Sequence, residues 1–68
     1  MDRFKLEYEM KKSGVTATKL CEDLEISRSA FQRKLAGKTD FKLGEIKKIM
    51  DYLGIDNPVP IFFADKVS

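Results

Sequence analysis

Two short amphipathic segments joined by only three residues constrain the fold of this chain more than any other feature of its sequence. The first is expected over Ala17–Leu24 and the second over Arg28–Leu35. Thr16 and Ser27 stand before them as N-cap residues, whose hydroxyls accept bonds from free N–H groups of the first helical turn. Because the joint is so short, the two helices must cross steeply and cannot lie antiparallel.

Apolar side chains at helical spacing supply a small core beneath this joint. They are Leu20, Cys21, Leu24, Ile26, Phe31 and Leu35. Cys21 lies where the helices cross, and we interpret it as a small buried hydrophobe that allows a close approach. With these side chains directed inward, the second helix must direct its polar ones outward. Those polar residues are Arg28, Ser29, Gln32 and Arg33.

Three further elements are expected around this pair. Phe4–Lys12 alternates apolar and charged residues, as a strand does, but its residue types favour a helix ended by Gly14. Leu43–Leu53 is a helix ended by Gly54, with an apolar stripe on one side. The stripe comprises Leu43, Ile46, Ile49, Met50 and Leu53. After a turn at 56–58, Ile61, Phe62 and Phe63 form a short apolar cluster, helical or extended. The sequence predicts an all-α fold of four to five helices in a single domain, residues 1–68.

Composition excludes several classes of protein. The chain has one cysteine and no histidine, so we expect no disulfide, no metal site and no cofactor. It shows no nucleophile–base pair and no glycine-rich phosphate loop, so we expect no catalytic residue and no enzymatic activity. No apolar run approaches the roughly 20 residues of a membrane span, and no signal-peptide stretch is visible. We therefore expect a cytoplasmic protein with no membrane partner.

Charge is unevenly distributed, although the net charge of the chain is only +2. Residues 27–48 carry seven Lys or Arg against two acidic residues, whereas 1–26 and 49–68 are each net negative. A basic central third suits contact with a polyanion; an ordinary solvated surface is the alternative explanation. An α-helix fits the major groove of B-DNA, where Gln pairs bidentately with adenine and Arg with guanine.

The stretch LCEDLEISRSAFQRKLAGKTDF, followed by LGEIKKIMDYLGI, resembles the phage repressor/Cro-like (Xre-type) helix-turn-helix family. The resemblance covers about residues 3–55. It rests on a small residue at Cys21, a serine at Ser27, a glycine at Gly37 and the run Leu53-Gly54-Ile55. Three positions depart from the family pattern: Glu25 stands at a turn position that is often glycine, Lys34 at a frequently apolar position, and Lys42 where a capping Ser or Thr is common.

The resemblance implies a lambda-repressor-like DNA-binding domain whose helix-turn-helix spans about 17–35. It implies a phage-type transcriptional regulator that binds double-stranded DNA sequence-specifically. The implied base contacts are Ser27, Arg28, Ser29, Gln32 and Arg33. The implied phosphate contacts are Thr18, Lys19, Lys38 and Thr39. No small-molecule ligand is expected.

The C-terminal segment, about residues 58–68, has two interpretations: it covers the core, or part of it joins two copies of the chain. So small a domain makes few phosphate contacts, and we expect a homodimer on a palindromic operator.

An alternative function is a protein-interaction module that keeps the helix-turn-helix fold but binds another regulator instead of DNA. Two features motivate this alternative: Glu25, because a carboxylate facing DNA is unfavourable, and the mixed charge of residues 1–26.

Overall fold

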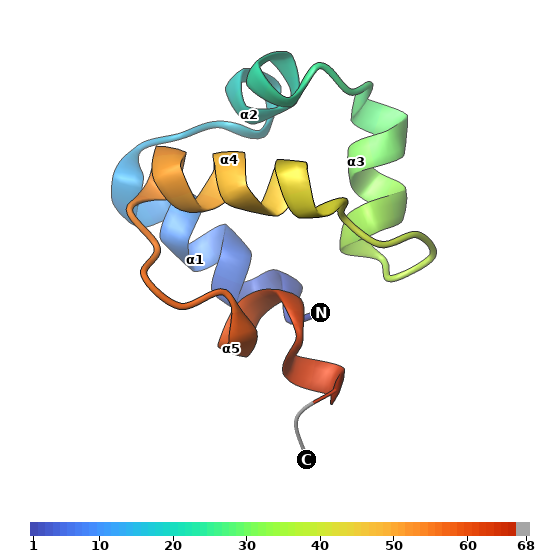
Figure 1. Ribbon diagram of the computed structural model, residues 1–68. Coiled ribbons are helices and arrows are strands. Elements are labelled where there is room, and N and C mark those ends of the chain that lie inside the picture. The colour runs from blue at the N-terminus through green and yellow to red at the C-terminus, as the bar shows by residue number, and fades with distance from the viewer. Residues whose placement is uncertain (67–68) are drawn as a thin grey trace.

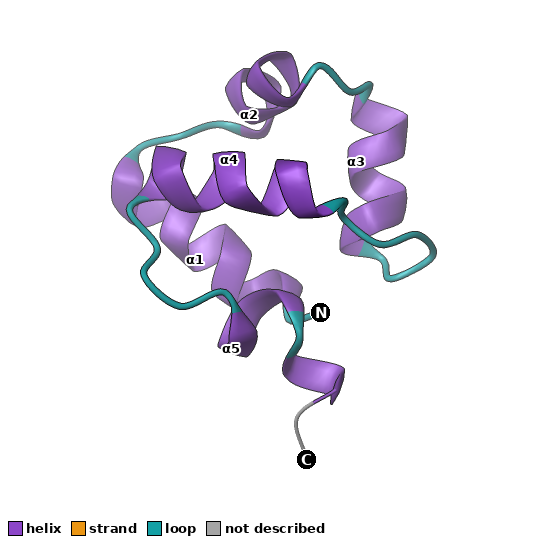
Figure 2. Ribbon diagram, in the orientation of Figure 1, coloured by secondary structure: helices purple, strands orange, loops and turns teal. Residues whose placement is uncertain are grey.

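The computed structural model describes residues 1–66, and those residues form helices and loops without a strand (Figures 1 and 2). The helices are α1 (Arg3–Ser13), α2 (Ala17–Leu24), α3 (Arg28–Leu35), α4 (Leu43–Leu53) and α5 (Val59–Phe62), followed by a 3-10 turn at Ala64–Lys66. The predicted all-α fold is confirmed, and α2, α3 and α4 begin and end where the sequence indicated. None of the helices described is long and apolar enough to cross a membrane.

Capping residues explain these helix limits. Thr16 Oγ1 accepts a bond from the Lys19 amide at 3.1 Å, and Ser27 Oγ accepts one from the Ala30 amide at 3.0 Å. Each bond satisfies an N–H group that the helix itself leaves free. At the C-terminal end of α4, Gly54 takes the left-handed conformation (φ 68°), which a residue without a Cβ atom adopts at little cost.

Segment α1 is a helix and not a strand. Leu6 and Met10, one turn apart, are buried, whereas Phe4 and Tyr8, also one turn apart, are 77% and 63% exposed. The apolar alternation in the sequence therefore arises from two i,i+4 pairs on opposite sides of one helix. The buried pair packs into the core, and the aromatic pair faces solvent.

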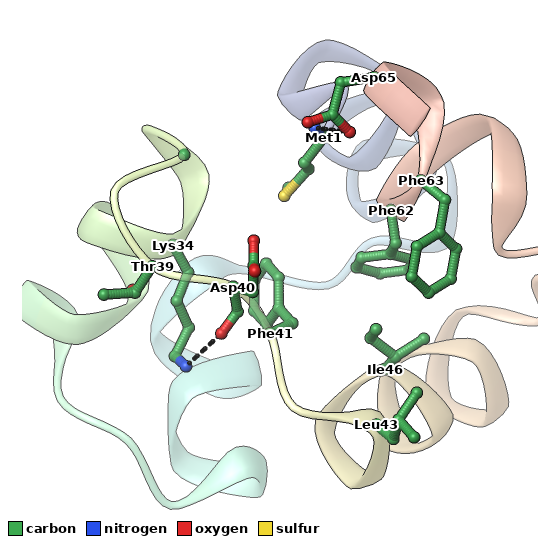
Figure 3. A pocket seen from close by; sticks show the side chains of 11 residues that line it. Met1, Lys34, Thr39, Asp40, Phe41, Leu43, Ile46, Phe62, Phe63 and Asp65 are labelled. Carbon is green, nitrogen blue, oxygen red and sulfur yellow. Dashed lines mark hydrogen bonds and ion pairs between the residues drawn. The ribbon is translucent and has the colours of Figure 1, made fainter. Parts of the chain in front are cut away.

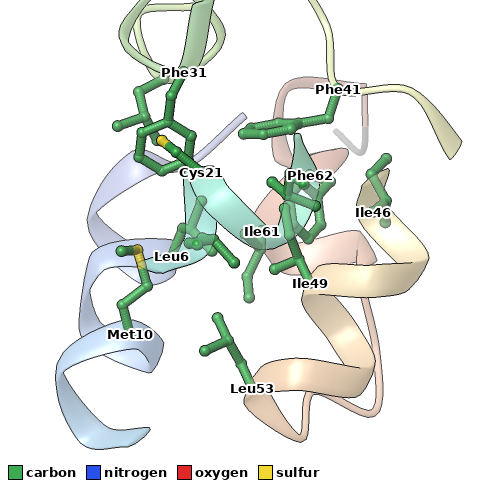
Figure 4. Packing of buried hydrophobic residues seen from close by; sticks show 13 residues of the cluster. Leu6, Met10, Cys21, Phe31, Phe41, Ile46, Ile49, Leu53, Ile61 and Phe62 are labelled. Atoms are coloured by element: carbon green, nitrogen blue, oxygen red, sulfur yellow. The ribbon is translucent and has the colours of Figure 1, made fainter. Parts of the chain in front are cut away.

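All five helices and the loop between α3 and α4 contribute to one core (Figure 4). Its buried side chains are Leu6, Met10, Leu20, Cys21, Leu24, Phe31, Leu35, Phe41, Ile46, Ile49, Leu53, Ile61 and Phe62. Five of the six residues predicted to close the joint are among them, and Ile26 packs partly buried against the same cluster. Phe41 contacts Phe31 and Phe62 edge-on, with ring centroids 6.1 and 5.6 Å apart.

The prediction for Leu43 is wrong. This residue was placed on the apolar stripe of α4, but its side chain is 77% exposed. Successive helical residues point about 100° apart, and the buried stripe centres on Ile46, Ile49 and Leu53. Leu43 lies roughly 80° from that centre by the same geometry. It is also the first residue of α4, at the end of the stripe.

The C-terminal segment covers the core with α5. Ile61 and Phe62 are buried, and the Asp2 amide donates to the Ile61 carbonyl at 2.7 Å, which ties the start of the chain to α5. Of the predicted segment 58–68, residues 67–68 lie outside the described residues.

Candidate nucleic-acid interface

The turn between α2 and α3 depends on Glu25. This residue has φ 58° and ψ 41°, and it is the one non-glycine residue with positive φ between residues 1 and 66. The Glu25 amide donates to the Glu22 carbonyl at 3.2 Å, and the Ile26 amide donates to the Cys21 carbonyl at 3.1 Å. These bonds satisfy carbonyls at the end of α2 and direct the chain sharply into α3 (Figure 1).

The outer face of α3 carries the predicted base-contacting residues. Phe31, Lys34 and Leu35 are the buried side chains of this helix. The residues predicted to contact bases are all exposed: Ser27, Arg28, Ser29, Gln32 and Arg33. Arg28 and Gln32 are four residues apart, and so are Ser29 and Arg33, so these four side chains form two neighbouring rows on one face of the helix. The Ser27 hydroxyl also serves as the N-cap.

A hydrogen bond joins this face to α2. Nη1 of Arg28 donates to Oγ1 of Thr18 at 2.9 Å. The bond brings one predicted base contact and one predicted phosphate contact together, and the guanidinium keeps further N–H donors for another acceptor. Beneath them, burial raises the pKa of the Cys21 thiol, and the nearby charge of Arg28 offsets this only in part.

All four predicted phosphate contacts are exposed, and they lie in two groups, one near each end of α3. Thr18 and Lys19 lie in the first turn of α2, next to the start of α3, and Lys19 forms a 3.8 Å ion pair with Asp23. Lys38 and Thr39 lie in the loop that follows α3 (Figure 1). The structure therefore places polar and cationic groups at both ends of the exposed α3 face.

Lys34 holds the loop after α3 from beneath. Its ammonium donates to the Asp40 carbonyl at 3.1 Å and forms an ion pair with Glu45 Oε1 at 3.2 Å. It also lies 5.6 Å from the centre of the Phe41 ring. Figure 3 shows the lysine side chain turned toward the Asp40 carbonyl, beside Phe41. The Lys34 side chain is only 10% exposed.

Glu45 completes this arrangement from α4. Its Oε1 atom also accepts a bond from the Lys42 amide at 2.8 Å. This is one of the two bonds of a capping box; the other would require an acceptor on the side chain of the N-cap residue, which lysine lacks. Burial alone would raise the pKa of Glu45, but the bonds from Lys42 and Lys34 together hold its pKa below the ordinary value. The carboxylate therefore stays ionised at neutral pH.

The sequence did not reveal that Lys34 is buried. Lys34 stands at a position that is frequently apolar in the family, and Leu35 packs into the core next to it. The lysine itself is nevertheless buried as well. The available signal was Glu45, a carboxylate in the first turn of the next helix. Pairing residues eleven positions apart requires the path of the loop, which the sequence pattern does not give.

Comparison with known proteins provides a family match. A family model described as a Cro/C1-type HTH DNA-binding domain matches residues 5–58. The matched span includes all nine residues predicted to contact bases or phosphates. No curated protein and no solved structure matches the chain. Among residues 1–66, no cluster of three or more His, Cys, Asp or Glu side chains could hold a metal ion.

Proposed function

The chain belongs to the Cro/C1-type helix-turn-helix DNA-binding domains, a family of non-enzymatic regulators, and from this premise we propose that it recognises a specific DNA sequence with α3. The observation that carries the proposal is the exposed polar face of α3, with no apolar side chain on it. We further propose that residues 1–68 act as one domain and that the protein is a phage-type transcriptional regulator.

Base recognition is assigned to the side chains of this face. Gln32 suits adenine, whose N6 and N7 it can pair bidentately, and Arg33 suits guanine through O6 and N7. Ser27 and Ser29 lie in the first turn, the part of a recognition helix that contacts base edges most closely. Arg28 contacts a base edge at the same end, where its bond to Thr18 limits its rotamers.

Phosphate binding is assigned to the groups at both ends of α3. Thr18 and Lys19 contact the backbone on one side of the major groove, and Lys38 and Thr39 contact it on the other side. Each lysine that neutralises a phosphate releases a counterion, so the affinity falls as salt rises. These contacts set the position of α3 in the groove and carry little sequence information.

A homodimer on a palindromic operator follows from the small number of phosphate contacts. Two α3 helices about 34 Å apart meet successive turns of the major groove and multiply the affinity. Ile61 and Phe62 are occupied in the core, whereas Val59, which is 38% exposed, and Pro60 are exposed apolar residues of α5 that a second copy could contact. Sedimentation with a selected palindromic duplex tests this, and a strict 1:1 complex would contradict the dimer.

Selection from random duplexes at fixed salt tests the proposed function itself. We expect a defined preferred sequence. Gln32→Ala or Arg33→Ala should weaken binding to that sequence far more than binding to a scrambled duplex, by about 1–3 kcal/mol for each lost base contact. Lys38→Ala should weaken both equally and lower the salt slope by about 1. The absence of any salt-dependent duplex binding would overturn the proposal and favour a protein partner.

A further inference from the structure

The buried pair of Lys34 and Glu45 lies under the loop that carries two of the proposed phosphate contacts. The ammonium binds the Asp40 carbonyl, one residue beyond Thr39. At the other end of the loop, the Lys38 amide donates to the Arg33 carbonyl at 3.0 Å. Lys38 and Thr39 therefore lie between two fixed points, one supplied by the backbone of α3 and the other by Lys34.

Phe41 anchors the end of this loop in the core, but the stretch before it is not closely packed on its inner side. A hollow of about 160 Å³ lies between the loop and α5, lined by Thr39, Asp40, Phe41, Phe62 and others (Figure 3). Lys38, Thr39 and Asp40 are exposed and have no core contact of their own, so the bond from Lys34 to the Asp40 carbonyl is what fixes this stretch of backbone.

The ion pair of Lys34 and Glu45 is not explained by a gain in stability alone. Burying two opposite charges costs solvation, and apolar residues of similar volume in such places are often neutral or stabilising. The Lys34 ammonium lies 5.6 Å from the centre of the Phe41 ring, and Lys34 lines the same hollow as Phe41 and the buried Ile46, apolar neighbours that would accept an apolar side chain. A bond to the loop backbone is what an apolar residue could not replace.

We propose that Lys34 is a positioning residue for DNA binding: paired with Glu45, it fixes the loop so that Lys38 and Thr39 meet backbone phosphates. This inference rests on the proposed function. It assigns no base contact to Lys34. It predicts that removal of the pair lowers affinity for every duplex alike and leaves the preferred sequence unchanged.

The test is the double substitution Lys34→Met/Glu45→Gln, which keeps the net charge of the protein at +2. Glutamine retains an oxygen that can accept from the Lys42 amide, so the start of α4 keeps its cap. The matched control is Lys12→Met/Glu9→Gln, which makes the same substitutions in a surface ion pair of α1 (3.3 Å). Circular dichroism establishes that each protein is folded at the temperature of the binding assay.

We expect the Lys34→Met/Glu45→Gln protein to unfold within a few degrees of the unaltered protein. Its affinity for a scrambled duplex should fall roughly 3- to 10-fold, and its salt slope should decrease by about 1, as for the loss of one phosphate contact. The control should bind within about 2-fold of the unaltered protein, since surface pairs contribute little. Adding Lys38→Ala should weaken the unaltered protein but have little further effect once the pair is removed.

Two results would overturn the inference while leaving the proposed function intact. One is wild-type affinity and salt slope in the folded Lys34→Met/Glu45→Gln protein. The other is an undiminished effect of Lys38→Ala in that background. Failure of the unaltered protein to bind any duplex is a separate result, which would overturn the proposed function and this inference with it.

Discussion

Replacement of Glu25 by glycine should stabilise the fold. Glu25 adopts a left-handed conformation at the end of α2, which is unfavourable for a residue with a Cβ atom because that atom approaches the following carbonyl oxygen. The side chain is exposed, and within the described residues it makes no hydrogen bond or ion pair that would be lost. The backbone bonds of the turn do not involve the side chain and should persist in Glu25→Gly.

The magnitude follows from two opposing terms. Relief of the left-handed strain contributes roughly 1–2 kcal/mol. Glycine also gives the unfolded chain more freedom, which offsets about 0.4–1 kcal/mol of this gain. With both terms at their lower values the net stabilisation is about 0.6 kcal/mol, and with both at their upper values it is about 1 kcal/mol. For a domain of this size, 1 kcal/mol raises Tm by about 4–8 °C, so Glu25→Gly should raise it by about 2–8 °C.

Thermal unfolding followed by far-UV circular dichroism measures this shift. Glu25→Ala is the matched control, because it removes the same carboxylate but keeps a Cβ atom. Its Tm should stay close to that of the unaltered protein. A Tm for Glu25→Gly at or below that of the unaltered protein, or an equal rise in both variants, would refute the argument from backbone strain.

Three further predictions concern the core and the buried ion pair. Because the pKa of Glu45 is held below its ordinary value of 4.5, its contribution to stability is fully present above that pH and is lost as the pH falls through the lower pKa. The gap between the urea midpoints of the unaltered protein and Glu45→Gln should therefore be constant from about pH 7 to pH 4.5 and should narrow as the pH falls further; a gap that stays constant below pH 4.5 would contradict this. Cys21 is buried and its pKa is raised, so it should react slowly with a thiol reagent in the native protein and rapidly in denaturant. Ile49→Ala should cost about 2–5 kcal/mol of unfolding free energy, because Ile49 is 0% exposed, whereas Leu43→Ala should change it by less than about 0.5 kcal/mol; denaturant titration of both variants provides the comparison.

Local signals in the sequence were sufficient for the helix-turn-helix. Thr16 and Ser27 mark the starts of α2 and α3 because side-chain caps act within three residues. Gly54 marks the end of α4 for an equally local reason, the left-handed conformation. The outward face of α3 followed once its buried neighbours were identified by spacing.

Features that depend on tertiary contacts could not be predicted in this way. Phe41 is buried because Phe31 and Phe62 surround it, and no periodic pattern covers a loop residue. The burial of Lys34 depends on Glu45 and on the course of the loop between them. Spacing alone also gave the wrong environment for Leu43, because the edge of an apolar stripe is buried only where a neighbouring element covers it.

The same limit applies to the candidate site. Spacing and family resemblance predict which side chains form it, but not how those side chains are connected. The bond between Arg28 and Thr18 joins two helices, and its formation depends on their crossing angle. The support that Lys34 gives to the loop likewise became visible only in three dimensions.

The most direct test of the central claim is a map of backbone amide chemical-shift changes when the selected duplex is added to ¹⁵N-labelled protein. If the exposed face of α3 binds DNA, the largest changes will fall on residues 27–33, with smaller ones at 18–19 and 38–39. Changes concentrated on α1 and α5, with α3 unaffected, would contradict the account.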